Sequence, residues 1–261
     1  MQLKNARILL TGASGGLGQE LARQLTDAGA ALLLAGRDHG RLALLGAALG
    51  PGSSSVCADL ERPAGVAALA GAAREFGVNV LINNAGVGAF GLFENQDWAS
   101  IERVLATNLE APIRLTHALL PWLRAQPQAA IVNIGSTFGS LPFPGFVAYS
   151  AAKAGLRGFS QALRRELADS LVAVIHIAPR AIDTPLNNEA VKALNQALKN
   201  HSDSPEVVAR QVVQALRRGD GEHHFGFPER FFAWLNGVSP SLVDRGLAGK
   251  LPIIKRHSSS S

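Results

Sequence analysis

Cysteine, tyrosine and methionine each occur only once in this chain of 261 residues. Cys57 has no second cysteine to pair with, which excludes an intrachain disulfide and favours a reducing compartment inside the cell. Because the apolar residues Val56 and Ala58 flank it, we expect a buried strand thiol and not a nucleophile. The sequence therefore indicates a cytoplasmic protein.

Long apolar runs are also absent. No apolar span of about 18 residues occurs, and the first residues lack a basic region followed by a long apolar run and a cleavage site. We therefore expect neither a membrane-spanning helix nor secretion.

Charged residues are scarce, at 17% of the chain against 47% apolar residues. This balance is typical of a sheet covered on both faces by helices rich in alanine and glycine. The net charge is +5, but lysines and arginines are scattered, so we expect no nucleic-acid partner. His223 and His224 have no ligand partners at a recognisable spacing, and no metal site is expected.

Short apolar runs alternate with helical patterns along most of the chain. The runs lie at residues 6–11, 31–35, 54–58, 78–82, 130–134 and 171–177, and a last strand is expected at 223–227. Such alternation predicts the α/β class, with a doubly wound parallel sheet and helices on both faces. We expect one domain over 1–227, its apolar extension over 228–250 and a flexible tail over 251–261.

A glycine-rich turn joins the first strand to the first helix. Glycines let the backbone turn tightly and approach a ligand, and the free amides of a helix start bind an anion. The turn therefore predicts a loop for the phosphates of a dinucleotide, made by Gly12, Ser14, Gly15, Gly16, Leu17 and Gly18. A plain glycine-rich turn without a ligand is the alternative.

The end of the second strand carries a residue that can select the cofactor. Arg37 follows the glycine turn by about 20 residues, where an acidic residue would bind ribose hydroxyls and an arginine suits a 2′-phosphate. Arg37 therefore favours NADP(H) over NAD(H). The alternative is a solvated arginine at the strand end, partly neutralised by Asp38.

Two further strand ends are expected at the cofactor. Asp59 and Leu60 follow the third strand, where the Asp59 carboxylate can accept from an adenine amine; the alternative is that Asp59 caps the helix after Pro63. The fourth strand runs into Asn83, Asn84, Ala85 and Gly86, which we expect to tie neighbouring strands together and border the cofactor.

The only tyrosine, Tyr149, precedes Lys153 by four residues, so a helix places both side chains on one face. A nearby ammonium favours the phenolate and would lower the pKa of the phenol toward neutrality, which allows proton transfer. A half-buried tyrosine beside a surface lysine is the alternative. Ser136 ends the fifth strand and can reach the space in front of Tyr149. Asn108 precedes a helix interruption at Pro112, where its amide would order a water leading to Lys153.

Apolar side chains surround these polar residues. Phe138, Phe143 and Phe146 follow Ser136 and would line a pocket for an apolar substrate, or else pack a lid. The segment 228–250 is also apolar. It is expected to be a dimer surface, a substrate cover or a membrane-surface patch, in that order.

Taken together and in this order, the motifs Thr11-Gly12-x-x-x-Gly16-x-Gly18, Asn83-Asn84-Ala85-Gly86, Asn108, Ser136 and Tyr149-x-x-x-Lys153 resemble the short-chain dehydrogenase/reductase family over about residues 5–220. The resemblance implies a Rossmann-type domain with a seven-stranded parallel sheet, NAD(P)-dependent hydride transfer, and dimers or tetramers. It also implies roles by position. Tyr149 would be the acid-base group and Lys153 would lower its pKa and bind the nicotinamide ribose. Ser136 would hold the substrate oxygen and Asn108 would maintain a water relay.

The resemblance also places Pro179, Ile182 and Thr184 beside the nicotinamide carboxamide. It fails at one position, because Arg180 stands where the family usually has a glycine after Pro179. Arg180 is expected to alter this turn, to bind an acidic substrate group, or to be a harmless exposed arginine.

These observations predict an NADPH-dependent oxidoreductase that reduces the carbonyl of an apolar ketone, aldehyde or 3-oxoacyl compound. The alternative is an NADP(H)-binding sensor or scaffold without turnover.

Overall fold

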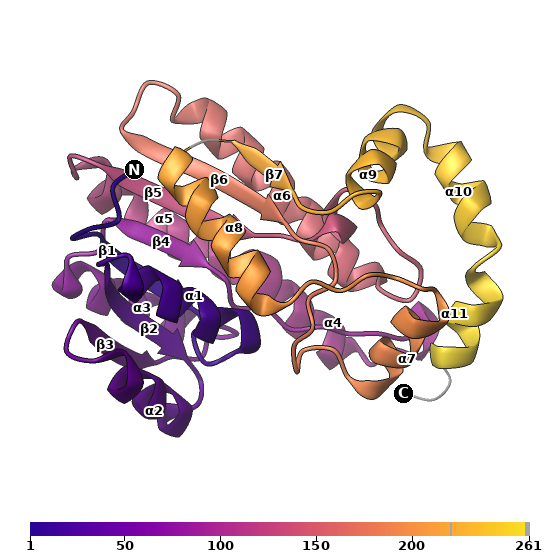
Figure 1. The fold of residues 1–261 in the computed structure, drawn as a ribbon, viewed down its shortest axis with the longest axis horizontal. Coiled ribbons are helices and arrows are strands. Elements are labelled where there is room, and N and C mark those ends of the chain that lie inside the picture. Colours follow the sequence, from indigo (N-terminus) through magenta and orange to yellow (C-terminus); the bar gives the residue numbers. More distant parts are fainter. Residues whose placement is uncertain (220, 259–261) are drawn as a thin grey trace.

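Seven parallel strands form a single sheet in the computed structural model, which describes residues 1–219 and 221–258 (Figure 1). Their order is β3-β2-β1-β4-β5-β6-β7. The strands are β1 (Arg7–Thr11), β2 (Ala31–Gly36), β3 (Ser53–Cys57), β4 (Val80–Asn83), β5 (Ala129–Ile134), β6 (Val172–Ala178) and β7 (Glu222–His224). The predicted doubly wound parallel sheet is confirmed, although its last strand is shorter than the expected 223–227.

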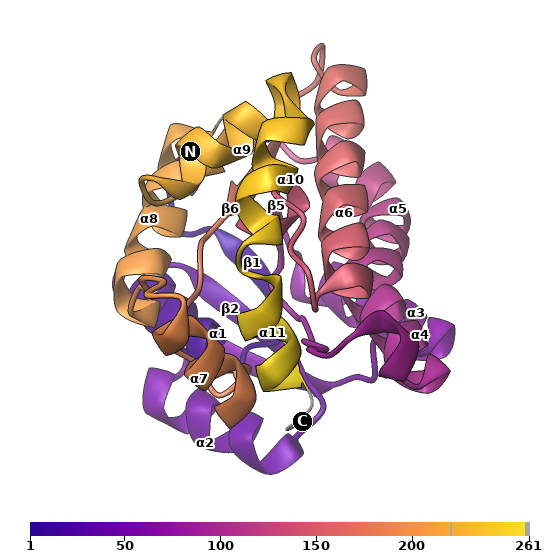
Figure 2. The ribbon, with the colours of Figure 1, turned by 90° about the vertical axis from the view of Figure 1, so that its right-hand side faces the viewer.

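Helices cover both faces of the sheet (Figure 2). One face carries α1 (Gly16–Asp27), α2 (His39–Leu49) and α8 (Pro205–Arg218). The other carries α3 (Pro63–Phe76), α5 (Ala111–Arg124) and α6 (Val147–Glu166), with α4 (Trp98–Leu105) beyond its end. The five inner strands of the sheet therefore lie between two layers, as their apolar runs require.

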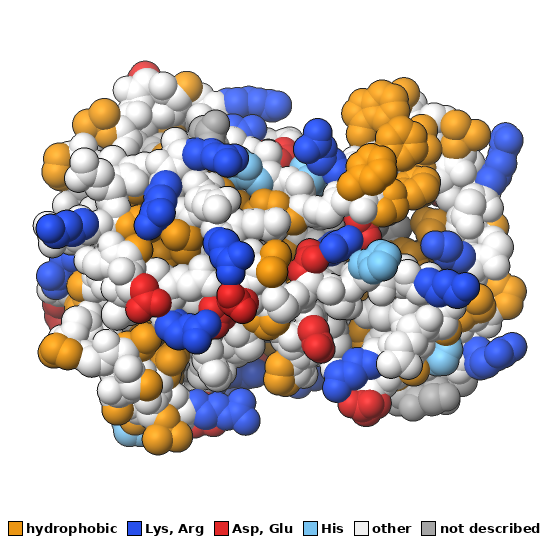
Figure 3. Space-filling model, in the orientation of Figure 1, with side chains coloured by type: hydrophobic (Ala, Val, Ile, Leu, Met, Phe, Trp, Pro, Cys, Tyr) orange, Lys and Arg blue, Asp and Glu red, His pale blue; other side chains and the backbone are white. Residues whose placement is uncertain are grey.

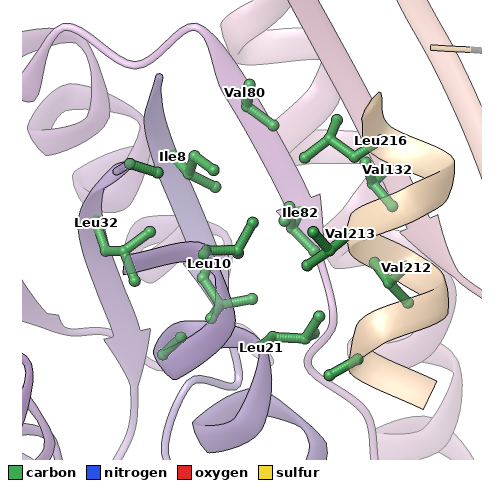
Figure 4. Close-up of a cluster of buried hydrophobic side chains, with 14 of the residues drawn as sticks. Ile8, Leu10, Leu21, Leu32, Val80, Ile82, Val132, Val212, Val213 and Leu216 are labelled. Atoms are coloured by element: carbon green, nitrogen blue, oxygen red, sulfur yellow. The ribbon is translucent and has the colours of Figure 1, made fainter. Parts of the chain in front are cut away.

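Alternate strand residues point into two separate cores. Leu10, Ile82 and Val132 pack against α1 and α8, where Leu21 and Val212 meet them (Figure 4). Their neighbours Leu9, Leu81 and Ile131 face the opposite way and pack against α3 and α5. The sheet is thus anchored on both sides, and its strand ends form a rigid edge.

The predicted helix interruption lies between α4 and α5. Residues Ala106–Glu110 form a π-helical turn, and Pro112 follows in the first turn of α5, where a missing N–H costs least. The π turn carries Asn108, which is completely buried. The expected disturbance of the helix is therefore confirmed.

The prediction of a buried thiol at Cys57 is wrong, because its side chain is exposed. β3 is the edge strand of the sheet, and Ser54 and Ser55 are exposed as well. The Cys57 thiol lies 3.2 Å from the carbonyl oxygen of Arg37 and donates to it.

The C-terminal region forms three helices, α9 (Glu229–Val238), α10 (Pro240–Ala248) and α11 (Leu251–Ser258). Figure 2 shows them as an arch in front of the sheet, with α11 beside α7 (Glu189–Ala197). The expectation of a flexible tail is wrong for residues 251–258, because Ile254 is buried against Phe143 and Leu194. The rest of that predicted tail, residues 259–261, lies outside the described residues. No helix in the described part of the chain is long and apolar enough to span a membrane.

Candidate active site

A cavity of about 1170 Å³ opens where the strands end, next to the switch point between β1 and β4. Residues that directly follow six strands line it, from Gly12 after β1 to Pro179 after β6. Of the residues predicted to bind cofactor or substrate or to act in catalysis, all but Asn108 line this one space. The strand ends thus bring together side chains that are far apart in the sequence.

The glycine turn has no room for side chains. Gly12 has a positive φ of +65°, and a Cβ there would lie 2.7 Å from Ala85 Cα. A Cβ on Gly18 would lie 2.1 Å from the Gly12 carbonyl oxygen. Gly16 faces Thr184, whose Cγ2 would be 2.9 Å from an added Cβ. The first amides of α1 are therefore open to the cavity, which fits the phosphates of a dinucleotide.

A polar clamp holds the neighbouring loop against this turn. The Thr11 hydroxyl accepts hydrogen bonds from the backbone amides of Asn84 and Ala85, both at 3.0 Å. The Asn84 side chain donates to the Thr11 carbonyl at 3.0 Å, and Asn83 donates to Asn133 on β5 at 2.8 Å. The predicted tie between strands is present, and Thr11 is a member of it that sequence reasoning left without a role.

The adenine end of the cavity is more charged than the sequence suggested. Arg37 donates to the Glu61 carboxylate at 2.8 Å, and Arg41 also lines the cavity. Asp38 does not neutralise Arg37, because its carboxylate caps α2 by accepting from the Arg41 amide at 2.9 Å. Glu61 and Arg41 were missed. Arg41 could have been found from the sequence, because it follows Asp38 by three residues, the spacing of an N-cap residue and the amide that it binds. No local signal pointed to Glu61.

Asp59 does not cap α3, whose N-cap residue is Arg62. Its carboxylate instead accepts from the Glu61 amide at 3.0 Å, within the turn that carries Glu61 toward Arg37. Leu60 lies beside it in the cavity lining. The alternative interpretation of Asp59 as a helix cap is wrong, and the expected adenine contact stays a prediction.

Tyr149 and Lys153 lie one turn apart on α6, as their spacing predicts. The Lys153 ammonium lies 5.7 Å from the centre of the tyrosine ring and donates to the Ile134 carbonyl at 2.8 Å. Burial lowers the pKa of Lys153 to about 8 and raises that of Tyr149, against a hydrogen bond with Ser136 that lowers it. The predicted lowering of the Tyr149 pKa is therefore wrong for this structure, because desolvation outweighs the hydrogen bond with Ser136.

Ser136 lies where its position at the end of β5 predicts. Its hydroxyl hydrogen-bonds with the Tyr149 hydroxyl and accepts from the Phe138 amide at 3.2 Å. That second bond caps the short 3-10 helix Thr137–Gly139 and fixes the serine side chain. Two hydroxyl groups therefore face the cavity side by side.

The side-chain amide of Asn108 makes two hydrogen bonds with the backbone of one residue, Val87. Its side chain donates to the Val87 carbonyl at 2.8 Å and accepts from the Val87 amide at 3.0 Å. It thereby holds the loop after β4, and a Cβ on Gly86 would lie 2.8 Å from its oxygen. The amide faces this loop in place of the expected water, and a water relay through Asn108 stays a prediction.

Aromatic rings form the wall beside Tyr149. Phe138 lies 5.2 Å from Phe143 and 5.1 Å from Phe146 between ring centres, and both Phe138 and Phe146 meet Tyr149 edge to face. Phe90 joins this cluster at 5.0 Å from Phe146 and was not predicted. The C-terminal arch completes the lining of the cavity with Phe232, Leu235, Leu242, Val243, Gly246, Leu247 and Lys250.

Arg180 is neither a solvated arginine nor free to meet an acidic substrate. Its guanidinium donates twice to Asp203, at 2.9 and 2.6 Å, and lies 3.7 Å from the Glu229 carboxylate. The bonds to Asp203 raise the pKa of Arg180, and its side chain is only 20% exposed. Arg180 therefore joins the end of β6 to the first turn of α9.

Comparison with known proteins agrees with this geometry. The family model for short chain dehydrogenases matches residues 6–195. The uncharacterised oxidoreductase DltE of Bacillus subtilis is 33% identical over 85% of this chain and 88% of its own. A short-chain dehydrogenase from Sphingobium yanoikuyae, solved with NADPH, superposes with a TM-score of 0.79 at 32% identity over 92% of this chain and 95% of its own.

A further solved structure, a short chain dehydrogenase/reductase from Burkholderia phymatum in complex with NAD, superposes with a TM-score of 0.84 at 26% identity. It covers 93% of this chain and 96% of its own. The chain belongs to the short-chain dehydrogenase/reductase family of oxidoreductases, whose members bind a nicotinamide cofactor. Since these structures hold either cofactor, family membership alone does not decide between NAD(H) and NADP(H).

Proposed function

We propose that this protein is an NADPH-dependent reductase for the carbonyl group of an apolar ketone, aldehyde or 3-oxoacyl compound. The observation that carries the proposal is the pair of hydroxyls of Ser136 and Tyr149 at the foot of an aromatic wall. The rings of Phe138 and Phe146 beside these hydroxyls would pack against the apolar body of the substrate.

The cavity fits the cofactor at its other end. The glycine turn would receive the phosphates, because its backbone has no side chains and the α1 amides open onto it. Pro179, Ile182 and Thr184 would border the nicotinamide end, where they line the cavity beyond β6. When bound, NADPH supplies the hydride for carbonyl reduction.

Tyr149 has the protonation state that a reduction needs. Burial raises its pKa, so the phenol keeps its proton at neutral pH and can donate it to the carbonyl oxygen as the alcohol forms. The Ser136 hydroxyl would hydrogen-bond the same oxygen and fix its position. Lys153, buried one turn away, would stabilise the phenolate that remains after proton transfer.

The preference for NADPH is supported by two arginines. Arg37 and Arg41 both line the adenine end of the cavity, and guanidinium groups match phosphate oxygens. Glu61 opposes them, since it already pairs with Arg37 and would repel a 2′-phosphate until the pair opens. Arg41 is paired as well, 3.4 Å from the Asp38 carboxylate, so the preference for NADP(H) would come from the fork-shaped match of guanidinium groups to a 2′-phosphate and not from an excess of positive charge.

Tyr149→Phe tests the proposed chemistry. We expect the variant to bind NADPH as the wild type does, because the ring contacts remain, and to lose turnover by several orders of magnitude because the donated proton is gone. NADPH fluorescence measures binding, and NADPH absorbance with a panel of ketones, aldehydes and 3-oxoacyl compounds measures turnover. Undiminished turnover would reject the role of Tyr149. Wild-type binding without oxidation by any compound would favour a sensor.

A further inference from the structure

The outer face of the C-terminal arch collects exposed apolar side chains. Six large ones lie between residues 227 and 242, and Trp234 and Val238 are 61% and 65% exposed. Phe231 packs its ring 6.0 Å from Trp234 and 5.6 Å from Phe232, so the side chains form one surface. We call the set Phe227, Phe231, Phe232, Trp234, Val238 and Leu242 the arch patch. Figure 3 shows hydrophobic side chains gathered over α9.

Other large apolar side chains that are exposed do not gather in this way. Leu44, Trp98 and Leu171, for example, lie on α2, on α4 and before β6. Single apolar residues are normal on a protein surface, whereas a contiguous patch marks an interaction site. The arch patch therefore needs a partner that covers it.

The charge around the arch patch identifies the chemistry of that partner. Residues 228–258 carry five lysines and arginines against two acidic residues, a net charge of +3. One of the acids, Glu229, lies 3.7 Å from Arg180, while Arg230, Arg245 and Lys250 are exposed and make no ion pair within residues 1–219 and 221–258. An apolar face with aromatic rings and a rim of cations complements a surface of anionic lipid.

A second copy of the chain fits this face less well. Two equal patches in a symmetric dimer would bring the same excess of positive charge together, which opposes association. An anionic bilayer supplies the opposite charge, and its acyl region accepts the aromatic side chains. We propose that the protein docks on the surface of anionic membranes through the arch patch, with α9 and α10 lying at the interface.

The arch patch continues into the active-site cavity. Phe232 and Leu242 belong to both, since each lines the cavity and is also 43% or 52% exposed. Resting on the proposed function, docking would let an apolar carbonyl compound pass from the bilayer to Tyr149 without crossing water. The arch would then serve both as a substrate cover and as the docking surface.

The direct test is sedimentation of the purified full-length protein with vesicles. We expect binding to phosphatidylcholine mixed with phosphatidylserine, and about tenfold weaker binding to phosphatidylcholine alone. Trp234→Ser should weaken binding about tenfold, because Trp234 lies in the patch and outside the cavity lining. Trp98→Ser is the matched control, since Trp98 is 64% exposed on α4, away from the arch.

Two results would overturn the docking proposal. One is a vesicle assay without the expected contrast: no binding to either kind of vesicle, which gives no contrast to measure, and an equal loss of binding in the Trp98 and Trp234 variants both count as this result. The other is a dimer in analytical ultracentrifugation that Trp234→Ser dissociates while vesicles remain unbound, which would assign the patch to a second copy. A blue shift of tryptophan emission on anionic vesicles, absent in Trp234→Ser, supports docking.

A kinetic comparison separates docking from the proposed reaction. With a long-chain ketone dissolved in anionic vesicles, Trp234→Ser should lower the rate about tenfold, while the rate with a short, water-soluble ketone stays unchanged. Vesicle binding without turnover of either ketone would leave docking standing and reject the reductase. Turnover of both ketones without vesicle binding would reject docking and leave the reductase standing.

Discussion

The two ends of the cavity are built in different ways. At the cofactor end, backbone meets backbone, and Gly12 and Gly18 lie so close to Ala85 and to each other that no methyl group fits. At the substrate end, aromatic side chains and the arch form the wall, and some of the same residues remain partly exposed. The cofactor end therefore has no room for added atoms on its backbone, whereas the shape of the substrate end depends on side chains that can be substituted.

Adding one methyl group to each end should give the largest contrast. Gly18→Ala places a Cβ 2.1 Å from a carbonyl oxygen, so we expect a loss of more than about 3 kcal/mol in unfolding free energy and loss of NADPH binding. Gly246→Ala in α10, which lines the substrate end, meets nothing within 4 Å and should change stability by less than about 1 kcal/mol. Urea unfolding and NADPH titration measure both; equal effects would refute the contrast.

The link between the two ends is the Arg180 ion pair. Arg180→Met leaves the carboxylates of Asp203 and Glu229 unpaired at 15% and 24% exposure, so we expect a loss of about 2 kcal/mol. Hydrogen exchange should also rise across α9, because Arg180 holds its first turn. Arg230→Met is the control, because Arg230 is an exposed arginine in α9 that directly follows Glu229. If both variants unfold at the same urea concentration, Arg180 is not the link.

A pH titration can show that the sheet beneath the site, and not the arch, limits acid stability. His176 on β6 is completely buried, and its Nδ1 lies 3.4 Å from the Ser160 hydroxyl. Burial lowers the pKa of His176 to about 3, although the Glu222 carboxylate acts to raise it. Because the folded-state pKa is depressed, this histidine's contribution to stability is present above the unfolded value near 6.5 and is lost as pH falls toward 3.

Between pH 6.5 and 5 the expected loss is about 2 kcal/mol of unfolding free energy. His176→Asn should flatten this slope, even where it lowers stability at all pH values. His39→Asn, at the exposed start of α2, should leave the slope as it is. Urea midpoints across this pH range provide the measurement. An unchanged slope in His176→Asn would show that another group is responsible.

The smallest expected effects concern cofactor choice at the adenine end. Glu61→Gln removes the carboxylate 2.8 Å from Arg37 and should raise affinity for NADPH about threefold, because exposed ion pairs contribute under about 1 kcal/mol. Arg37→Ala should lower affinity for NADPH and leave affinity for NADH nearly unchanged. Competitive titration with both cofactors tests this, and a parallel loss for both would argue against a phosphate contact.

Prediction from sequence succeeded where a motif is local. The glycine turn, the four-residue spacing of Tyr149 and Lys153, and the strand ends all depend on neighbours in the chain, so alternation and spacing sufficed. It failed at Cys57, since apolar flanks cannot tell a central strand from the edge strand β3. It also failed at Arg180, whose partners Asp203 and Glu229 come from later segments.

The sequence by itself determined the order of strands and helices, the family and the set of residues that meet at the strand ends, because each of these follows from short-range spacing. Only the tertiary structure decided the electrostatics of the site. Burial raises the pKa of Tyr149, and Lys153 donates to the Ile134 carbonyl; desolvation depends on atoms contributed from the whole chain. The same holds for the arch, whose placement follows from the burial of Ile254 against Phe143 and Leu194.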